Sequence, residues 1–567
     1  MSKWIQRGSF TSIKDVILNN IGLTEEELIN PPQNYYISGL KEAADVILNA
    51  IMSDIKITIY GDYDADGITS SALLYQLLTR LGAKNVTIQI PRRFSEGYGF
   101  SLSALSKIDE GLILMVDNGI AAVDAIKEAK ALGLTTVILD HHLISKDGIL
   151  PPADVIVDPN AISGSDFSSY CGAGLAFKLA QMMLSDEKFL DKLSSLAAIG
   201  TIADVMPLIK DNRNIVLRGL ANINNGDSFV GLRVLLEQLS LYICDEEDIA
   251  FKIAPTINAC SRMLDDGAMI AVRLLATESS EWAKRYATKL IELNQERKQV
   301  VAEGMTICEQ IMADQCLYGE SPLIVHTTKT SPSHIHEGVA GILAGKLAER
   351  FKCPAFVLTE TENGVLKGSG RSFGGINIKS LLDSVSDSLI AYGGHSGAAG
   401  LKVCLDNINA FKQSIQKKMS ALPSDSSVNS DVIYYDLEID ESNVFAALSE
   451  LKRYAPFGEG NTKPIFTIKN VHLIPKAGKF YRLMGDVGQH IKLFASDFDV
   501  VAFDMSENYR LLGEPLRINL IGNISENRFN GNVYPQITAM DMAKENAEKP
   551  KSSLADALAD LMKNNGF

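Results

Sequence analysis

Short apolar runs separated by helical patterns dominate the region between residues 57 and 157. Apolar residues at helical spacing fill most of the intervals between these runs. Alternation of this kind favours a doubly wound α/β domain, with a parallel sheet and helices on both of its faces. The predicted strands are residues 57–60, 86–90, 112–116, 136–139 and 154–157.

The hydrophobic pattern changes before and after this region. Residues 1–55 are predicted to be a helical lead-in, and the α/β domain is expected to cover residues 56–278. Residues 279–315 carry apolar positions at helical spacing after two serines that can cap a helix. This stretch is therefore predicted to be a long helix that connects two parts of the chain.

Two further domains are predicted beyond the connecting helix. Residues 316–422 predict a second, smaller α/β domain, and its glycine-dense stretch at 392–400 is expected to be a loop whose backbone approaches a ligand closely. After a linker at 422–430, short alternating strands over residues 431–545 favour a small β-barrel. The tail at 546–567 is predicted to be a docked helix, with partner binding as the alternative.

Polar side chains follow each of the five strands of the first domain. In doubly wound sheets ligands bind at the carboxyl ends of the strands, so these side chains are expected to meet at one edge. The segments that follow the strands are Gly61-Asp-Tyr-Asp-Ala-Asp, Pro91-Arg-Arg-Phe, Asp117-Asn-Gly, Asp140-His-His and Asp158-Pro-Asn.

The first of these segments is the most acidic. Asp62, Asp64 and Asp66 occupy alternate positions, and Gly67 is expected to open a helix. In extended backbone, alternate side chains point to the same side, so the three carboxylates would converge and favour a hard divalent cation. The alternative is an acidic turn with an aspartate N-cap ahead of a helix that begins at Ile68.

Composition limits the class of protein. The chain has 567 residues, 46% of them hydrophobic and 22% charged, which favours several globular domains. No apolar run approaches the roughly 18–20 residues that span a membrane. The N-terminus has no apolar signal core, and the seven cysteines are scattered, so a reducing cytoplasm is expected. A net charge of −15 argues mildly against a nucleic-acid-binding surface over the whole protein, but not against a local basic groove.

Together, the strand-end residues and one later aspartate predict a metal centre. Four carboxylates and one imidazole suit two Mn²⁺ or Mg²⁺ ions about 3.5–4 Å apart, a pair that activates water and clamps the oxygens of a phosphoryl transfer. Each residue also has a structural alternative, as a turn residue, a helix-terminal carboxylate or a packed histidine. The predicted ligands are Asp64, Asp66, Asp117, His141 and Asp204.

Several motifs resemble the DHH phosphoesterase superfamily, and within it the RecJ family. The four DHH motifs match, in order, Tyr60-Gly-Asp-Tyr-Asp-Ala-Asp-Gly, Val116-Asp-Asn-Gly, Leu139-Asp-His-His and Ile199-Gly-Thr-Ile-Ala-Asp-Val. The associated DHHA1 domain is similar to His336-Glu-Gly-Val-Ala-Gly-Ile, Gly368-Ser-Gly-Arg-Ser and Gly393-Gly-His-Ser-Gly-Ala-Ala-Gly. Residues Pro456-Phe-Gly-Glu-Gly-Asn, Asn527-Arg-Phe-Asn-Gly and Pro535-Gln-Ile resemble the OB-fold region of the RecJ family.

The resemblance implies roles for individual residues. It makes the five predicted ligands the metal site, supported by Asp62 and Asp140, with His142 facing the scissile phosphate. On the same basis Arg262 would contact the backbone near the cut. The residues implied to bind the 5′-phosphate, or to face the site from the second domain, are Arg93, Ser369, Arg371, His336 and His395.

The function implied is that of a single-strand-specific 5′→3′ DNA exonuclease that releases 5′-mononucleotides in recombination and repair. The β-rich domain would bind single strands on its aromatic residues, with Phe480, Tyr481, Phe494 and Phe529 as candidates. The implied partners are single-stranded DNA, a single-strand-binding protein and a RecQ-type helicase, with the enzyme as a monomer.

Two other functions remain open from the sequence. One is a DHH phosphodiesterase of short oligonucleotides or cyclic dinucleotides. Such enzymes are usually shorter and lack an OB-like module, so residues 431–545 argue against this alternative. The other is a catalytically inactive replication scaffold, and the presence of all five predicted ligands argues against that.

Overall fold

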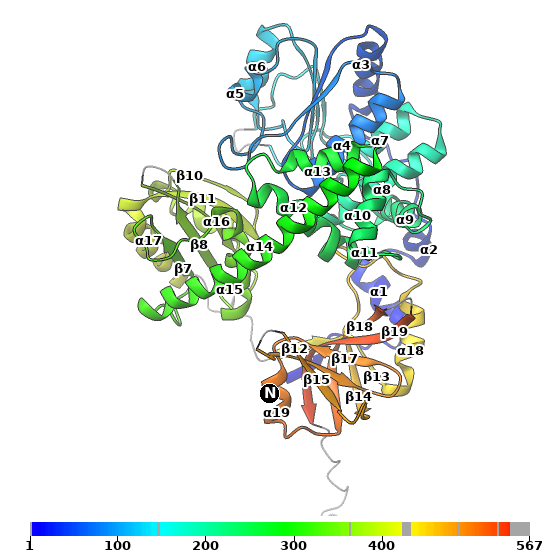
Figure 1. Cartoon of the computed structure of the whole chain (residues 1–567), viewed down its shortest axis with the longest axis vertical. Coiled ribbons are helices and arrows are strands. Elements are labelled where there is room, and N and C mark those ends of the chain that lie inside the picture. The colour runs from blue at the N-terminus through cyan, green and yellow to red at the C-terminus, as the bar shows by residue number, and fades with distance from the viewer. Residues whose placement is uncertain are drawn as a thin grey trace, which may run out of the picture. The chain divides into compact units, whose positions relative to one another are not determined.

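The computed structural model describes residues 3–144, 148–361, 364–421, 432–485, 487–529 and 532–544 (Figure 1). The chain divides into two units. The larger unit spans Asn30–Val428 and includes Gly458–Gly460, and the smaller one combines Met1–Ile29 with Asn429–Phe457 and Asn461–Phe567. Within the described ranges, no helix is both long and apolar enough to cross a lipid bilayer.

The first part of the larger unit contains a five-stranded sheet in which every pairing is parallel, as predicted. The chain runs from β2 to β3 on one side and then to β4 on the other, so the strand order reverses beside β2. Such a reversal is where doubly wound sheets bind ligands. In spatial order the strands are β3 (Val86–Gln89), β2 (Ile57–Tyr60), β4 (Leu112–Val116), β5 (Thr135–Leu139) and β6 (Val155–Val157).

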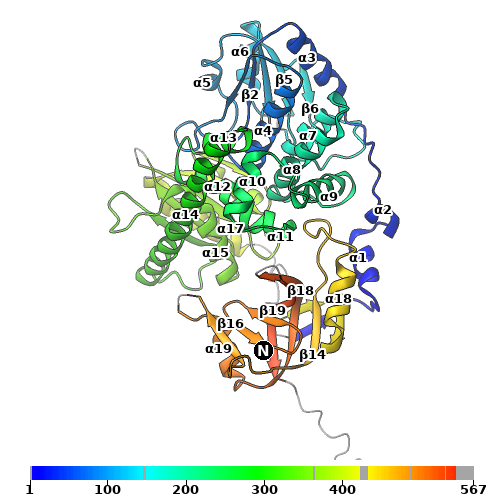
Figure 2. The same cartoon turned by 45° about the vertical axis from the view of Figure 1, so that its right-hand side comes forward.

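Both faces of this sheet are buried. Along β4, Leu112 and Leu114 belong to one hydrophobic core, and Ile113 and Met115 belong to another. Successive side chains of a strand point to opposite faces, so helices must cover both sides. The first core includes residues of α3 (Leu40–Met52), α4 (Ala65–Arg80) and α7 (Gly172–Met183), and the second includes residues of α5 (Leu102–Leu105) and α6 (Val123–Ala131). Figure 2 shows these helices from a second side.

A helical region follows the sheet and extends the first core. Its elements are α8 (Glu187–Ala203), α9 (Lys210–Asn224), α10 (Val230–Gln238), α11 (Glu246–Asp248), the π-helix η1 (Ile249–Ile253), α12 (Ala254–Met263) and α13 (Ala268–Ala276). The predicted connecting helix is confirmed as α14 (Ser280–Asp314), and Ser279 caps it by accepting a hydrogen bond from the amide of Trp282. Its first half packs in the first core through Leu290, whereas its second half packs in a separate core through Cys308.

A second five-stranded sheet follows α14. Its spatial order is β10 (Ala391–Gly394), β11 (Ala398–Cys404), β9 (Val365–Arg371), β8 (Ala355–Glu360) and β7 (Leu323–Thr327). Only β7 and β8 pair in parallel. The helices are α15 (Ala340–Phe351), α16 (Ile378–Asp383) and α17 (Ile408–Ser420), and short 3₁₀ turns lie at Glu337–Val339, Ser386–Ser388 and Leu405–Asn407.

The prediction of a loop at residues 392–400 is wrong for most of that stretch. Residues 391–394 and 398–404 form the antiparallel pair β10–β11, with His395 in the turn between them. Glycine is uncommon inside strands, which is why its density indicated a loop.

The smaller unit contains a seven-stranded sheet and the start of the chain. The sheet order is β13 (Leu437–Asp440), β14 (Phe466–His472), β18 (Arg517–Phe529), β19 (Asn532–Lys544), β17 (Asp499–Ala502), β16 (His490–Phe494) and β15 (Tyr481–Met484). Its helices are α1 (Ile13–Ile21), α2 (Glu25–Ile29), α18 (Val444–Leu451) and α19 (Ser506–Leu511), and a 3₁₀ turn lies at Glu441–Asn443. Closure of this sheet into a barrel stays a prediction. The predicted linker at 422–430 and the tail at 546–567 lie outside the described residues.

The expectation that residues 1–55 are entirely helical is wrong at the N-terminus. Lys3–Gln6 forms strand β1, which pairs in parallel with β12 (Val432–Tyr435). Ile17 and Leu28 pack in the core of the smaller unit, so the first 29 residues belong with the C-terminal part of the chain. A strand of four residues whose partner lies more than 400 positions away leaves little local signal in a sequence.

Candidate metal centre

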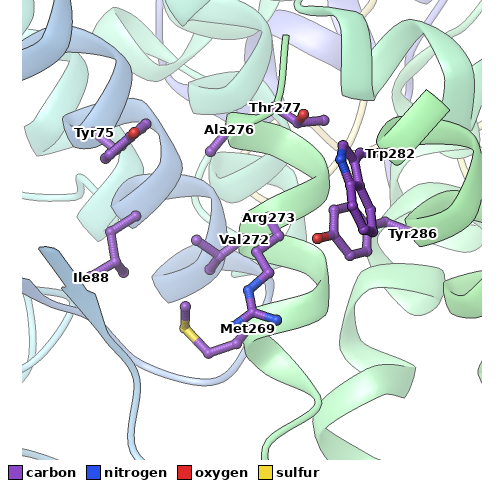
Figure 3. Close-up of a pocket in the computed structure, with 9 residues that line it drawn as sticks. All are labelled: Tyr75, Ile88, Met269, Val272, Arg273, Ala276, Thr277, Trp282 and Tyr286. Atoms are coloured by element: carbon purple, nitrogen blue, oxygen red, sulfur yellow. The ribbon is translucent and has the colours of Figure 1, made fainter. Parts of the chain in front are cut away.

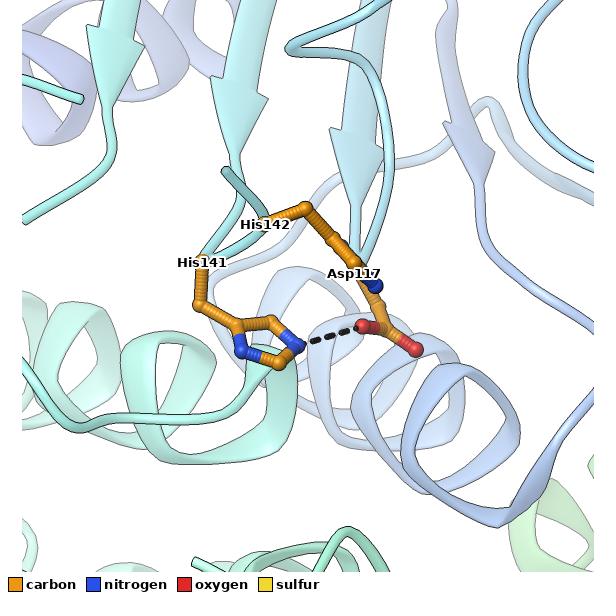
Figure 4. Close-up of side chains that lie close together, drawn as sticks. All are labelled: Asp117, His141 and His142. Carbon is orange, nitrogen blue, oxygen red and sulfur yellow. Dashed lines mark hydrogen bonds and ion pairs between the residues drawn. The ribbon is translucent and has the colours of Figure 1, made fainter. Parts of the chain in front are cut away.

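The carboxyl ends of three neighbouring strands bring the predicted acidic and imidazole side chains together. Asp62 follows β2, Asp117 follows β4, and His141 follows β5. Asp204 joins them as the C-terminal cap of α8. Among the described residues, three groups of side chains have ligand atoms within 4.8 Å of one another, which is close enough to hold a metal ion. They are Asp117, His141 and His142 (Figure 4), then Asp66, His141 and Asp204, and finally Asp62, Asp64 and Asp117.

Asp64 and Asp66 lie at the beginning of a helix, not in the extended segment that was expected. Helix α4 begins at Ala65, two residues before the predicted opening at Gly67, with Asp64 as its N-cap. The Asp64 carboxylate accepts the amides of Asp66 and Gly67, each at 3.0 Å. The alternative, an acidic turn with an aspartate N-cap, is therefore correct for the backbone, although the helix begins at Ala65 and not at Ile68. Asp62 and Asp64 lie close to Asp117, whereas Asp66 lies close to His141 and Asp204, and cation binding by this segment stays a prediction.

Asp66 is fixed by the beginning of another helix. The amides of Gly172 and Ala173, in the first turn of α7, donate to its two oxygens at 2.6 and 2.9 Å. Amides at a helix N-terminus favour a negative charge, so α7 orients this buried carboxylate. A side chain on Gly172 would meet the Cβ of Asp117 at 2.6 Å, and therefore only glycine fits between these two aspartates.

His141 lies at the centre of the cluster. Its Nε2 is 3.0 Å from Oδ1 of Asp117, 3.6 Å from Oδ2 of Asp204 and 3.9 Å from Oδ2 of Asp66. Burial, reinforced by the neighbouring charge of His142, lowers the pKa of His141 to about 4. The imidazole is therefore neutral at physiological pH, which is the form that ligates metals.

Asp140 supports both histidines. One of its oxygens accepts the amide of Ile120 at 2.9 Å, and the other lies 2.7 Å from Nδ1 of His142. Burial acts to lower the pKa of His142, but the hydrogen bond with Asp140 outweighs burial and raises this pKa to about 9. The pKa of Asp140 lies below its ordinary value, since the interaction with His142 outweighs the effect of burial. His142 is thus a positively charged group beside the cluster.

The carboxylates of the cluster repel one another. Burial first, and then the charge of Asp64, raises the pKa of Asp62 well above its ordinary value. Burial, followed by the charges of Asp66 and Asp64, also raises the pKa of Asp117 well above its ordinary value. Burial and the charge of Asp64 raise the pKa of Asp66 to about 6. Burial and the charges of Asp66 and Asp64 raise the pKa of Asp204 to about 8. Oδ1 of Asp62 and Oδ2 of Asp204 are buried without a hydrogen-bond partner among the described residues. Oxygen ligands in this state fit hard divalent cations, which supply the missing positive charge.

Three arginines form a basic group in the same unit. Burial, then the charges of Arg93 and Arg371, lowers the pKa of Arg262 to about 9, which shows that the three guanidinium groups are close. Arg371 donates to Oγ of Ser369 at 2.8 Å, and Arg93 lies over the ring of Tyr63. Within the described part of the chain, none of the three forms an ion pair with a carboxylate. Half-buried guanidinium groups that no described carboxylate neutralises favour a bound anion.

The two histidines of the second domain lie in different settings. His336 caps the turn before α15, since its Nδ1 accepts the amide of Gly338, and its ring meets the edge of Phe94 at 5.8 Å. His395 is exposed in the β10–β11 turn, and its charge contributes to lowering the pKa of His141. Among the described residues, no hydrogen bond or ion pair joins the His395 side chain to the cluster.

Two further side chains belong to this site. The hydroxyl of Tyr98 lies 3.1 Å from Nε2 of His142, and Nδ2 of Asn160 donates to the carbonyl oxygen of His141 at 2.5 Å. Asn160 lies in one of the strand-end segments, so its position could have marked it. Tyr98 lies in a Gly-Tyr-Gly segment that gives no such signal.

Three models of known protein families match the domains of this chain. Residues 56–201 match the DHH family N-terminal domain, residues 321–421 match the DHHA1 domain, and residues 435–541 match the RecJ OB domain. The fold and the cluster thus define a protein of the DHH class.

Individual relatives make the assignment narrower. The single-stranded-DNA-specific exonuclease RecJ of Haemophilus influenzae is 30% identical over 521 residues, covering 85% of this chain and 86% of the relative. RecJ of Bacillus subtilis is 35% identical over 525 residues, which cover 90% of this chain but 64% of the relative. The chain belongs to the RecJ family.

A solved structure agrees with this assignment. The crystal structure of RecJ in complex with Mn²⁺ from Thermus thermophilus superposes with a TM-score of 0.77 and 29% identity, covering 96% of this chain and 79% of that one. The structure of the same protein in complex with Mg²⁺ gives a TM-score of 0.71.

Proposed function

We propose that the protein is a metal-dependent exonuclease that removes 5′-mononucleotides from single-stranded DNA in the 5′→3′ direction. The observation that carries the proposal is the cluster of buried carboxylates around His141, which lies in the same unit as three arginines that no described carboxylate neutralises. An acidic cluster holds cations, and a basic group holds phosphate. Phosphodiester hydrolysis needs both.

The metal-holding residues of this proposal are five side chains. When bound there, two divalent cations would neutralise charge on the phosphate oxygens and lower the pKa of a water molecule. Asp140 fixes His142 through a hydrogen bond, and the charged imidazole would stabilise a scissile phosphate. Mn²⁺ and Mg²⁺ are the expected cations, as the names of the Thermus structures indicate for that protein. The proposed ligands are Asp64, Asp66, Asp117, His141 and Asp204.

The 5′ end of the strand is proposed to bind in the second domain. Ser369 and Arg371 present a hydroxyl and a guanidinium at the end of β9, and a planar guanidinium matches phosphate oxygens in a bidentate manner. Arg93 and Arg262 add positive charge on the side of the first domain. A terminal phosphate held there would direct cleavage to the 5′ end.

The seven-stranded sheet of the smaller unit is proposed to bind single-stranded DNA and so to add to the preference for single strands. Phe480 and Tyr481 are partly buried beside the core of the smaller unit, and Lys476 lies over the ring of Phe494. Lys479, Phe480 and Arg482 line a cavity of about 530 Å³, which combines cationic and aromatic side chains as single-strand-binding surfaces do. The side chain of Phe529 lies outside the described residues. A single-strand-binding protein and a RecQ-type helicase stay predicted partners, and the monomeric state and cytoplasmic location also stay predictions.

The test uses the purified chain with Mn²⁺ and single-stranded DNA labelled at its 3′ end, with and without a 5′-phosphate. The expected result is progressive shortening of the labelled strand, absent on blunt duplex DNA and in EDTA. The Asp117→Ala variant should lose cleavage and keep strand binding, since it removes a ligand and leaves the arginines in place.

Other outcomes would redirect the assignment. Cleavage confined to very short oligonucleotides or cyclic dinucleotides would identify a small-substrate phosphodiesterase instead. Strand binding without cleavage under all metal conditions would indicate an inactive scaffold. An active Asp117→Ala variant would show that the metal ligands are wrongly assigned.

A further inference from the structure

A cavity of about 350 Å³ in the larger unit is lined by residues of α4, β3, α13 and α14, among them Tyr75 and Trp282 (Figure 3). The ring of Trp282 stacks on that of Tyr286 at 5.7 Å, and the guanidinium of Arg285 lies over the Trp282 ring at 4.9 Å. These three side chains contact one another, so they act there as packing groups and not as a ligand site. A more specific arrangement lies in the turn that follows Asp204.

The carboxylate of Asp204 is held differently from those of the other proposed ligands. The Asp66 carboxylate accepts two backbone amides of α7, and the Asp64 carboxylate accepts two amides of α4. Among the described residues no hydrogen bond reaches the Asp204 carboxylate, and its Oδ2 lies 3.6 Å from Nε2 of His141. The position of this carboxylate therefore depends on the backbone of α8, which ends at Ala203, and on the turn that follows.

The first part of this turn is fixed from within the first domain. The amide of Met206 donates to the carbonyl oxygen of Thr201 at 3.0 Å. Asn212 of α9 donates to the carbonyl oxygen of Pro207 at 3.1 Å. These hydrogen bonds join the turn to the two helices that it connects.

The next residue of the turn, Leu208, contacts a segment from the C-terminal part of the chain. The amide of Leu208 donates to the carbonyl oxygen of Glu459 at 2.7 Å, and the Leu208 side chain is buried. Gly458–Gly460 belongs to the larger unit, although the residues on either side of this segment belong to the smaller one. Three C-terminal residues are thus built into the turn that follows a proposed metal ligand.

Two glycines permit this close approach. A Cβ on Gly458 would lie 2.8 Å from Cδ1 of Leu208, and a Cβ on Gly460 would lie 3.0 Å from Cβ of Pro207. Gly460 also has a φ of 72°, in the left-handed region that favours glycine. The segment therefore packs directly on two residues of the turn, with no room for a side chain between them.

We propose that Gly458–Gly460 is a positioning segment of the metal centre, which holds the turn after α8 so that the Asp204 carboxylate stays beside Asp66 and His141. These three side chains are close enough to hold one cation. The inference rests on the metal ligands of the proposed function and adds a support for one of them. Changes to groups that support metal ligands lower metal affinity by about 10- to 100-fold. The C-terminal part of the chain would thus contribute to cation binding as well as to strand binding.

Binding of Mn²⁺ tests the proposal without DNA or turnover. Free Mn²⁺ gives a sharp paramagnetic resonance signal that is lost on binding, so the free ion can be counted during a titration of the protein. Gly460→Ala should bind one of two Mn²⁺ ions about tenfold more weakly than the parent, because the new Cβ displaces Pro207. The other ion should bind unchanged. Asp204→Asn identifies the affected ion, since it alters the ligand itself.

Gly513→Ala is the matched control for backbone strain. Gly513 has a φ of 84°, and a Cβ there would meet nothing within 4 Å. Gly460→Ala and Gly513→Ala should therefore lower the unfolding temperature to a similar degree, whereas only Gly460→Ala should lose Mn²⁺ affinity. Glu459→Ala should bind Mn²⁺ as the parent does, because the exposed side chain is removed and the carbonyl oxygen is kept.

A second variant avoids the strained backbone. Gly458 has no positive φ, so Gly458→Ala crowds Leu208 alone and should weaken the same Mn²⁺ ion to a smaller degree than Gly460→Ala does. In cleavage of single-stranded DNA, both variants should need more Mn²⁺ for half of the maximal rate. Excess Mn²⁺ should restore that rate, which it would not do for a misfolded enzyme.

Two results would overturn the proposal. They are Mn²⁺ binding in Gly460→Ala and Gly458→Ala that equals that of the parent, and an equal loss of both ions, which would indicate a general disturbance of the fold. Either result beside a parent that binds Mn²⁺ and cleaves DNA leaves the exonuclease assignment intact. A parent that binds no Mn²⁺ would refute the proposed metal ligands and this inference together.

Discussion

Nδ1 of His142 lies 2.7 Å from Oδ1 of Asp140, and that same oxygen accepts the backbone amides of His141 and His142 at 2.8 and 3.2 Å. One buried carboxylate thus sets the charge of one histidine and the backbone of both. His141 is left neutral among the carboxylates, whereas His142 is charged. Two adjacent imidazoles therefore have different roles because of their surroundings.

The first prediction concerns this pair. Asp140→Asn removes the interaction that raises the pKa of His142, so the pKa should fall from about 9 towards its ordinary value. In the Mn²⁺-dependent cleavage of single-stranded DNA, the alkaline limb of the pH–rate profile should move down by roughly 1–2 pH units. The maximal rate should fall by about 10- to 100-fold. A slower enzyme with an unmoved alkaline limb would show that Asp140 acts through the fold alone.

The second prediction is that the metal-free protein loses stability as the pH rises from 5 to 9. A carboxylate whose pKa is raised by folding binds its proton more tightly in the folded state, so folding is penalised once the unfolded chain has released that proton. Asp204, with a pKa raised to about 8, is such a group. His142 acts in the same direction, since its stabilisation is complete below its unfolded pKa and is lost as the pH passes about 9.

Thermal unfolding in EDTA and in Mn²⁺ checks this prediction. The metal-free midpoint should fall with rising pH, and Mn²⁺ should restore it more strongly at pH 8 than at pH 5. Asp117→Asn should raise the metal-free midpoint at pH 8, because it removes one of the repelling charges, and should reduce the effect of Mn²⁺. Equal midpoints at both pH values would mean that the carboxylates are not destabilised by burial.

The sequence predicts that these acidic and imidazole side chains meet, because parallel strands end at one edge. Asp62, Asp117 and His141 each follow a strand, and the position of a strand end can be recognised from the apolar run before it. The contribution of Asp204 is harder to recognise, since it depends on where α8 ends in space. Its motif predicts a place in the cluster, whereas the hydrophobic pattern around it does not.

Other features depend on contacts that a local pattern does not contain. The amides of Gly172 and Ala173 orient Asp66 from more than 100 residues away, and β1 pairs with a strand near the other end of the chain. The glycine-dense sequence of the β10–β11 pair predicts a loop, because glycine lacks the side chain that marks a strand.

The third prediction concerns the 5′ end of the substrate. Arg371→Met should remove the preference for a 5′-phosphate over a 5′-hydroxyl, since the planar guanidinium is the group proposed to bind that phosphate. Arg371→Lys should recover only part of the preference, because a lysine keeps the charge and loses the bidentate geometry. The ratio of kcat/KM for the two substrates measures the effect. A ratio unchanged in Arg371→Met would place the phosphate elsewhere.

The fourth prediction uses two glycines one turn apart on α15. A Cβ on Gly341 would lie 3.0 Å from Nη2 of Arg371 and 3.2 Å from Oγ of Ser369, whereas a Cβ on Gly345 would meet only Cγ of Arg371, at 3.9 Å. Both substitutions to alanine favour the helix by about 0.5–1 kcal/mol. Only the new Cβ of Gly341→Ala would crowd the side chains of Arg371 and Ser369, which form the proposed phosphate site.

Gly345→Ala should therefore be more stable and keep the 5′-phosphate preference of the parent. Gly341→Ala should lose part of that preference, by a factor of about 3–10, because the guanidinium must move a few tenths of an ångström from the position in which it contacts Ser369. Cleavage of a 5′-hydroxyl strand should change little in either variant. If both variants lost the preference equally, the effect would arise from the helix itself and not from the contact between Gly341 and Arg371.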